Sequence, residues 1–114
     1  MSETEVSQSA VVLNINAELP VINESTTSRV ILSNPLLRVV DFTFDTGQLL
    51  TEHTSPRAVV VTLLDGEMDF KLEGESHIMH AGDMIYLAPG APHALTAITP
   101  CRLQLVMVDT TSQA

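Results

Sequence analysis

The sequence predicts an all-β protein, built as a sandwich or barrel of short antiparallel strands. Turn-forming residues, chiefly Gly, Pro, Asn and Asp, recur at a spacing of about 8–12 residues over most of the chain. Several segments between these turns alternate apolar and polar residues, as residues 68–72 do, which is typical of strands with one buried and one wet face. No segment shows the 3.6-residue apolar period of an amphipathic helix.

The length and the net charge of the chain limit the classes of function that it can have. With 114 residues, 45% of them apolar, the chain is long enough for one domain with a real core and is not disordered throughout. The formal net charge is −9 and the five basic residues are scattered, so we expect neither nucleic acid nor an anionic membrane as a partner. No apolar run approaches the length of a membrane span.

Cysteine usage and the N-terminal residues indicate the compartment. Cys101 is the only cysteine, so no intrachain disulfide can form. The N-terminal residues are polar and acidic, without a basic-then-apolar signal segment. We therefore expect a cytoplasmic protein.

We expect the strands within one domain, residues 11–109, between a flexible N-terminal tail (1–10) and a C-terminal tail (110–114). Residues 11–15 suit an outer strand or a partner-contacting arm, and residues 23–28 have turn chemistry. The strands expected from alternation and turns are residues 29–32, 36–44, 58–64, 67–72, 77–80, 84–87, 93–97 and 102–108.

The strongest functional pointer is the stretch of residues 82–95. Pro89 lacks a backbone donor and Gly90 tolerates positive φ, so the chain must turn at this pair. The following strand then begins at His93, ahead of the apolar Ala94 and Leu95. We expect the corner to aim the His93 imidazole at whatever this strand faces.

A second candidate segment spans residues 47–57. If it is extended, Thr51, His53 and Ser55 share one face. His53 and His93 could then supply two imidazoles to a common interior, which is fewer than the three or four protein ligands usual for zinc. The alternative is a pair of hydrogen-bonded core histidines.

The remaining candidates have simpler interpretations. His77 and His80 are three residues apart, so they face opposite sides of a strand, and we expect His80 to face solvent. His77 is either a site residue or a partly buried strand residue. Cys101 shares parity with Leu103 and is expected to be a small buried hydrophobe rather than a nucleophile.

Together the two segments resemble the motifs of the cupin superfamily, over roughly residues 36–108. Its first motif reads Gly, five residues, His-x-His, three or four residues, Glu, six residues, Gly. Gly47, His53 and Gly66 match, whereas Ser55 stands at the second His and Val59 at the Glu.

The second cupin motif reads Gly, five residues, Pro-x-Gly, two residues, His, three residues, Asn. Gly82, Gly90 and His93 match, whereas Ala88 replaces the Pro and Ala97 replaces the Asn. The resemblance implies a double-stranded β-helix, or jelly-roll barrel, with both histidines and Val59 facing one lumen.

The replacement of two motif ligands by Ser55 and Val59 limits which cofactor the chain is expected to bind. Metal-dependent cupins resemble one another in a set of three His and one Glu, of which only His53 and His93 are in place. The resemblance therefore implies no certain cofactor, and at most a weakly bound divalent transition metal (Zn, Ni, Fe or Mn) completed by His77, Ser55 or water. Arg57 is either a ligand-binding residue at the barrel mouth or a solvated loop residue.

The leading hypothesis is a small cytoplasmic cupin-like barrel that binds a small polar molecule in its lumen through His53, Ser55, Arg57 and His93. The alternative is a metal-dependent enzyme, a dioxygenase or an isomerase, with a weak His-based site. A third possibility is a regulatory or scaffold barrel. We also expect a homodimer, with the N-terminal strand or the outer sheet in the interface.

Overall fold

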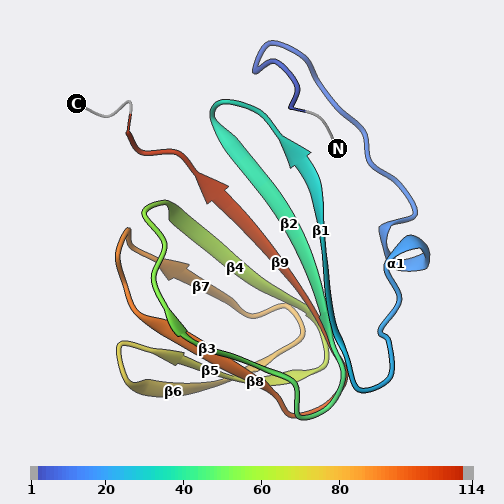
Figure 1. Cartoon of the computed structure of the whole chain (residues 1–114), viewed down its shortest axis with the longest axis vertical. Coiled ribbons are helices and arrows are strands. Elements are labelled where there is room, and N and C mark those ends of the chain that lie inside the picture. The colour runs from blue at the N-terminus through green and yellow to red at the C-terminus, as the bar shows by residue number, and fades with distance from the viewer. Residues whose placement is uncertain (1–2, 112–114) are drawn as a thin grey trace.

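The computed structural model describes residues 3–111 and consists of two antiparallel sheets. One sheet has five strands in the order β1-β2-β9-β4-β7, and the other has four in the order β3-β8-β5-β6. The two sheets converge at one end of the molecule and diverge at the other (Figure 1). The strands are β1 (Thr26–Ser33), β2 (Leu37–Phe44), β3 (Leu49–His53), β4 (Ala58–Asp65), β5 (Glu67–Leu72), β6 (Glu75–His80), β7 (Met84–Leu87), β8 (His93–Ala97) and β9 (Cys101–Val108).

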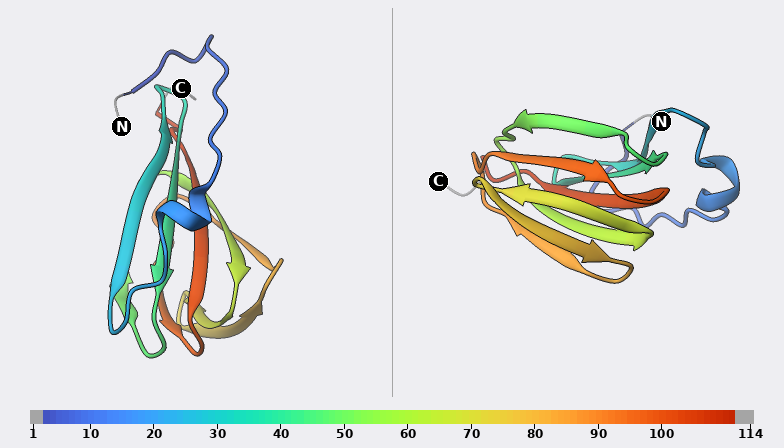
Figure 2. Two further views of the ribbon diagram at one scale, coloured as in Figure 1. Left: turned by 90° about the vertical axis from the view of Figure 1, so that its right-hand side faces the viewer. Right: turned by 90° about the horizontal axis from the view of Figure 1, so that it is seen from below.

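The strand order confirms the jelly-roll topology. The last strand, β9, lies between β2 and β4, and β8 lies between β3 and β5, so most neighbours in each sheet are distant in the chain, apart from the consecutive pairs β1-β2 and β5-β6. The second view of Figure 2 shows the four-stranded sheet in this order. The only helix of the described residues is the single turn α1 (Ile15–Glu18), and no helix among them could span a membrane.

The core lies between the sheets and follows from the alternation in the sequence. On β4, Val59, Val61 and Leu63 are buried while the residues between them are more exposed. Met68 and Phe70 on β5 oppose them from the other sheet. Each such side chain contributes about 1.5–3 kcal/mol on burial, which makes this interior the main stabilising feature of a chain with few aromatics.

The N-terminal segment differs from its prediction, because residues 11–15 form no strand. Val11 and Leu13 are exposed, and the chain makes the turn α1. Three contacts hold this segment beside the outer face of the five-stranded sheet (Figure 2). Arg102 Nη1 donates to Leu19 O at 2.8 Å, Thr43 Oγ1 donates to Pro20 O at 3.5 Å, and Arg29 Nη1 lies 2.5 Å from Glu18 Oε2. Residues 11–15 thus form no strand, and residues 18–20 after them contact β1, β2 and β9 of their own chain.

The flexibility expected of the N-terminal tail (1–10) and of the C-terminal tail (110–114) stays a prediction. Thr4 N donates to Ser33 O at 2.7 Å, so part of the 1–10 tail contacts the end of β1. Residues 1–2 of that tail and residues 112–114 of the C-terminal tail lie outside the described residues. The expected turn at 23–28 is shorter than predicted, since Thr26 already belongs to β1.

Candidate functional site

His93 is positioned by the Pro89-Gly90 corner, as the sequence predicted. Gly90 has φ 82°, and its N–H donates to Ser55 O at 2.8 Å, which ties this corner to the loop between β3 and β4. β8 then begins at His93, a buried residue that is 8% exposed. Its Nδ1 lies 2.9 Å from Ala91 O, so the ring is fixed by the backbone just before it.

His53 ends β3 and is positioned by a β-bulge. Leu50 pairs with Leu95 and His53 pairs with His93, so β3 has one residue more than β8 between the two pairs. Leu50 and His53 therefore line the same cavity, whereas Thr51 lines a separate shallow groove on the other side of the sheet. The prediction that Thr51 shares a face with His53 is wrong, because simple alternation does not hold across a bulge.

The two imidazoles form one pair. Their ring centroids are 4.2 Å apart and their planes are inclined by 59°, which confirms the expected proximity. His53 Nδ1 lies 2.8 Å from Thr51 O, an arrangement that repeats the one between His93 and Ala91. A carbonyl can only accept, so Nδ1 of each ring carries the proton and donates. Nε2 of each neutral ring is then left with a lone pair.

Both rings line a cavity of about 300 Å³ between the sheets. Ser55 and Val59 also line it, as expected from the sequence. Of the lining residues, His53 and Thr54 are exposed, so the cavity opens at the end of β3 and the loop after it. Figure 1 shows the β3–β4 and β7–β8 loops at the diverging end of the sheets. Apart from His53, Thr54, Ser55 and His93, the lining is apolar: Val40, Phe42, Leu50, Pro56, Val59, Val61, Phe70, Leu87, Leu95, Leu103, Leu105 and Met107.

Burial lowers the pKa of His93, the buried histidine of the pair. Desolvation lowers the pKa of His93 from its ordinary value of 6.5, and the neighbouring His53 acts in the same direction. The hydrogen bond to Ala91 O opposes this shift in pKa without reversing it. The pocket therefore favours the neutral form of His93, which keeps Nε2 available as an acceptor or ligand.

Two predicted site residues are not brought into this cavity. Arg57 follows the mouth loop, and its backbone N–H donates to Ser55 Oγ at 3.2 Å, but its side chain does not line the cavity. His77 is exposed on β6 and lines a different, more open pocket beside Ile85. The pairing of His53 and His93 is thus formed without either residue.

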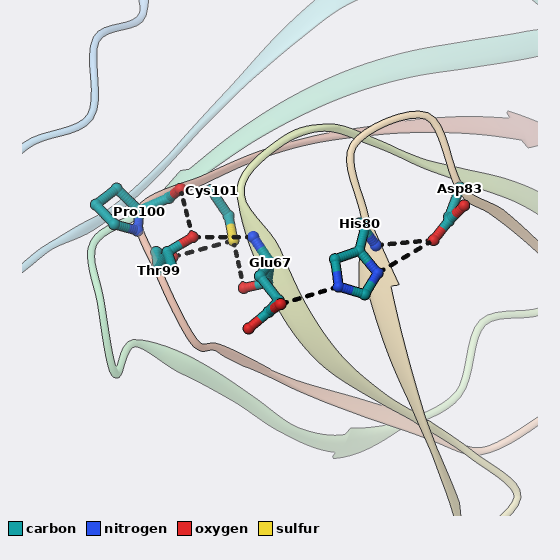
Figure 3. Close-up of polar contacts among 6 residues, drawn as sticks. All are labelled: Glu67, His80, Asp83, Thr99, Pro100 and Cys101. Atoms are coloured by element: carbon teal, nitrogen blue, oxygen red, sulfur yellow. Dashed lines mark hydrogen bonds and ion pairs between the residues drawn. The ribbon is translucent and has the colours of Figure 1, made fainter.

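A second polar cluster lies away from the cavity (Figure 3). His80 Nε2 is 2.9 Å from Glu67 Oε2, and the backbone N–H of His80 donates to Asp83 Oδ2 at 2.8 Å. His80 is exposed, as predicted. These contacts connect the beginning of β5, the end of β6 and the turn before β7, so we assign the cluster a structural role.

Cys101 adjoins that cluster as a buried thiol. Its Sγ lies 3.1 Å from both Glu67 O and Thr99 O, and 1% of the residue is exposed. Burial raises the pKa of this thiol, which disfavours the thiolate. The expectation of a small buried hydrophobe is therefore confirmed.

The residues of the cavity do not fit a firmly held metal. They offer two imidazoles and the neutral hydroxyls of Thr54 and Ser55, with no carboxylate. Across residues 3–111, no group of three or more His, Cys, Asp or Glu side chains is placed to hold an ion. Two nitrogen ligands are fewer than the three or four protein ligands usual for zinc.

A model of the cupin domain family matches residues 40–109, more than half of the chain. This chain is a member of the cupin family. The matched region extends from β2 to the residue after β9 and includes both histidines of the pair. No curated protein matches this cupin.

Solved structures support the same assignment. This cupin superposes on a conserved protein of unknown function from Streptococcus pyogenes with a TM-score of 0.80 and 29% identity, over 96% of each chain. KdgF from Halomonas sp. gives 0.71 and 21%, over 88% of this cupin and 96% of KdgF. Salicylate 1,2-dioxygenase from Pseudoaminobacter salicylatoxidans gives 0.71 and 17%, over 82% of this cupin and 29% of the dioxygenase. At these identities the last two show a shared fold.

Apart from Val59, sequence reasoning missed the apolar residues of the site. Leu50 is brought in by the bulge, which leaves no local signal in the alternation. Phe42 and Phe70 line the cavity from opposite sheets, and Phe70 stacks on His93 with centroids 6.0 Å apart and an interplanar angle of 5°. The alternation in residues 36–44 and 67–72 could have identified these two as inward-facing.

Proposed function

We propose that this cupin binds a small molecule in its lumen and that His53 and His93 recognise it at the mouth. One observation carries the proposal: two imidazoles 4.2 Å apart, each fixed through Nδ1 by a backbone carbonyl, border an apolar cavity of about 300 Å³. Cavities with few, fixed polar groups are the usual form of small-molecule sites, and this one is at the lower end of their usual size.

Preorganisation supports a binding role. A ring whose Nδ1 is already engaged loses little rotamer freedom when a ligand arrives, so less binding free energy is lost to ordering. The Gly90 contact to Ser55 O also connects the two loops that form the mouth. We include a cytoplasmic location in the proposal, supported by the single, free and buried Cys101.

A fragment screen tests the proposal. With ¹³C-labelled histidine, bound fragments should shift the ring signals of His53 and His93 and leave those of His77 and His80 unmoved. His53→Ala and His93→Ala should abolish or greatly weaken binding, while the exposed controls His77→Ala and His80→Ala should bind as wild type does. Circular dichroism checks that each variant retains the β-sheet signal. Fragments that bind all five proteins equally would contradict the proposal.

The second candidate is a metal-dependent enzyme, a dioxygenase or isomerase. Its support is that both histidines are held through Nδ1, the arrangement that orients imidazole ligands in metal sites. Against it stands the absence of a carboxylate among the residues that line the cavity. Elemental analysis of untagged, freshly purified protein distinguishes the candidates, since a stoichiometric metal that survives chelator would favour the enzyme.

A further inference from the structure

The polar groups of the cavity are confined to its mouth. His53, Thr54 and Ser55 are consecutive at the end of β3 and the loop after it, and His93 faces them across the β3–β8 pair. The other lining residues are aliphatic side chains, Pro56, and the aromatic rings of Phe42 and Phe70. A ligand that fills the cavity therefore meets one polar end and an apolar body.

The polar end combines the fixed Nε2 acceptors of the two histidines with the hydroxyls of Thr54 and Ser55, which can donate as well as accept. Nδ1 of each histidine donates to a backbone carbonyl, so Nε2 of each neutral ring can only accept. Ser55 Oγ already accepts the N–H of Arg57. His93 is buried, whereas His53 is exposed at the mouth, where water can reach it. Nε2 of His93 belongs to the less exposed of the two rings, so it has less access to water and gains more from a donor of the ligand.

Building on the proposed function, we propose that the ligand is a neutral, largely apolar molecule with one hydroxyl group, which donates a hydrogen bond to His93 Nε2. A carboxylate has no proton to donate to Nε2 of either ring, and the hydroxyls of Thr54 and Ser55 are the only side-chain donors that this end of the cavity offers it. A sugar would place several hydroxyls against aliphatic side chains that cannot pair with them. This class differs from the polar molecule expected from the sequence, because the sequence did not reveal how apolar the rest of the cavity is.

The volume of the cavity also limits the size of the ligand. A dry apolar cavity of about 150 Å³ holds benzene, so about 300 Å³ has room for roughly ten to twelve non-hydrogen atoms. Both an alkylphenol and a medium-chain alcohol fit this limit. Phe42 and Phe70 can pack against the apolar part of either molecule. The alkylphenol and the alcohol therefore both supply one hydroxyl and an apolar body of suitable volume.

Isothermal titration calorimetry at pH 8 with matched probes tests the ligand class. The probes are 4-propylphenol, octan-1-ol, 4-propylanisole, which lacks the hydroxyl proton, and 4-propylbenzoate. We expect the phenol or the alcohol to bind at least about tenfold more tightly than the ether and the carboxylate. Whichever of the phenol and the alcohol binds more tightly shows which of these two kinds of molecule the cavity prefers. His93→Phe keeps a ring beside Phe70 but removes the acceptor, and it should bind the phenol and the ether equally.

The outcomes separate this inference from the proposed function. Equal or tighter binding of the carboxylate, or a fragment screen dominated by sugars, would overturn the ligand class and leave lumen binding intact. Failure of all four probes would overturn the ligand class too, and the histidine-dependent fragment screen then decides whether the proposed function also fails. The wild-type comparison stands if His93→Phe does not fold.

Discussion

At the scale of single residues, two backbone carbonyls define the chemistry of the site. Ala91 O and Thr51 O each accept from an Nδ1, and this fixes which nitrogen of His93 and His53 is free. The sequence predicted both histidines and their common cavity. It did not predict these carbonyl contacts, because they depend on the ring rotamers and on the bulge in β3.

The pH dependence of stability follows from His93. Its pKa is lowered in the folded protein, so between that lowered value and 6.5 the unfolded chain binds more protons. The free energy of unfolding should therefore fall as pH drops below about 6.5, and level off once the folded-state pKa is passed. Urea denaturation from pH 5.5 to 8 measures this. His93→Phe should have a flatter profile, and an unchanged slope would contradict the assignment.

A metal site should be restorable at two positions. Ser55 and Val59 line the cavity and stand where the cupin motif has a His and a Glu. Ser55→His with Val59→Glu should lose about 2–4 kcal/mol of stability without metal, because Val59 is 2% exposed and a carboxylate there is unpaired. Nickel or zinc at a hundred times its dissociation constant should restore about 2.7 kcal/mol.

Thermal denaturation with and without metal measures this effect, and the wild type should show a much smaller stabilisation. A double variant that gains no more than the wild type would show that the two histidines are not oriented to share an ion.

At the scale of secondary-structure elements, alternation and turns predicted most strands. The bounds of β5, β7 and β8 agree with the expected segments 67–72, 84–87 and 93–97. The sequence predicted β3 only on the condition that residues 47–57 are extended. The bulge in this strand interrupts the two-residue alternation that would have predicted it directly. Of the two alternatives for residues 11–15, the outer strand is wrong and the partner-contacting arm stays a prediction, because apolar composition alone does not distinguish them.

The turn between β4 and β5 provides a test of packing between elements. Gly66 has φ 92°, and a Cβ there would lie 2.2 Å from Pro100 O. Gly82 has a similar φ of 95° but open space around it, which makes it a matched control. Gly82→Ala should cost about 1–2 kcal/mol for the left-handed backbone, and Gly66→Ala should cost clearly more. Equal losses in urea denaturation would show that the Pro100 contact relaxes freely.

At the scale of the whole molecule, one half of the five-stranded sheet is left uncovered. Residues 18–20 contact the half formed by β1, β2 and β9. On the other half, Val60 pairs with Tyr86 and Thr62 with Met84, so these four residues share the outer face. Tyr86 and Met84 are 55% and 59% exposed. Because residues 11–15 form no strand, the outer sheet remains of the two expected interfaces, and its exposed part is this outer face of β4 and β7.

We predict that two copies associate through this face, because a symmetric dimer is the commonest way to cover such a surface. Light scattering should give twice the 12.3 kDa of one chain. Tyr86→Glu should shift the protein toward monomer, while Ile78→Glu, an exposed apolar site on the other sheet, should not. A monomeric wild type at micromolar concentration would refute the prediction.

The most direct test of the account is the tautomeric state of the four histidines, measured by long-range ¹H–¹⁵N correlation NMR at pH 8. The binding proposed for the lumen requires both His53 and His93 to have Nδ1 protonated and Nε2 free. We predict that spectrum for these two residues, with their Nε2 signals shifting when 4-propylphenol is added. If either ring carries its proton on Nε2, or if the probe shifts neither signal, the recognition pair described above does not exist.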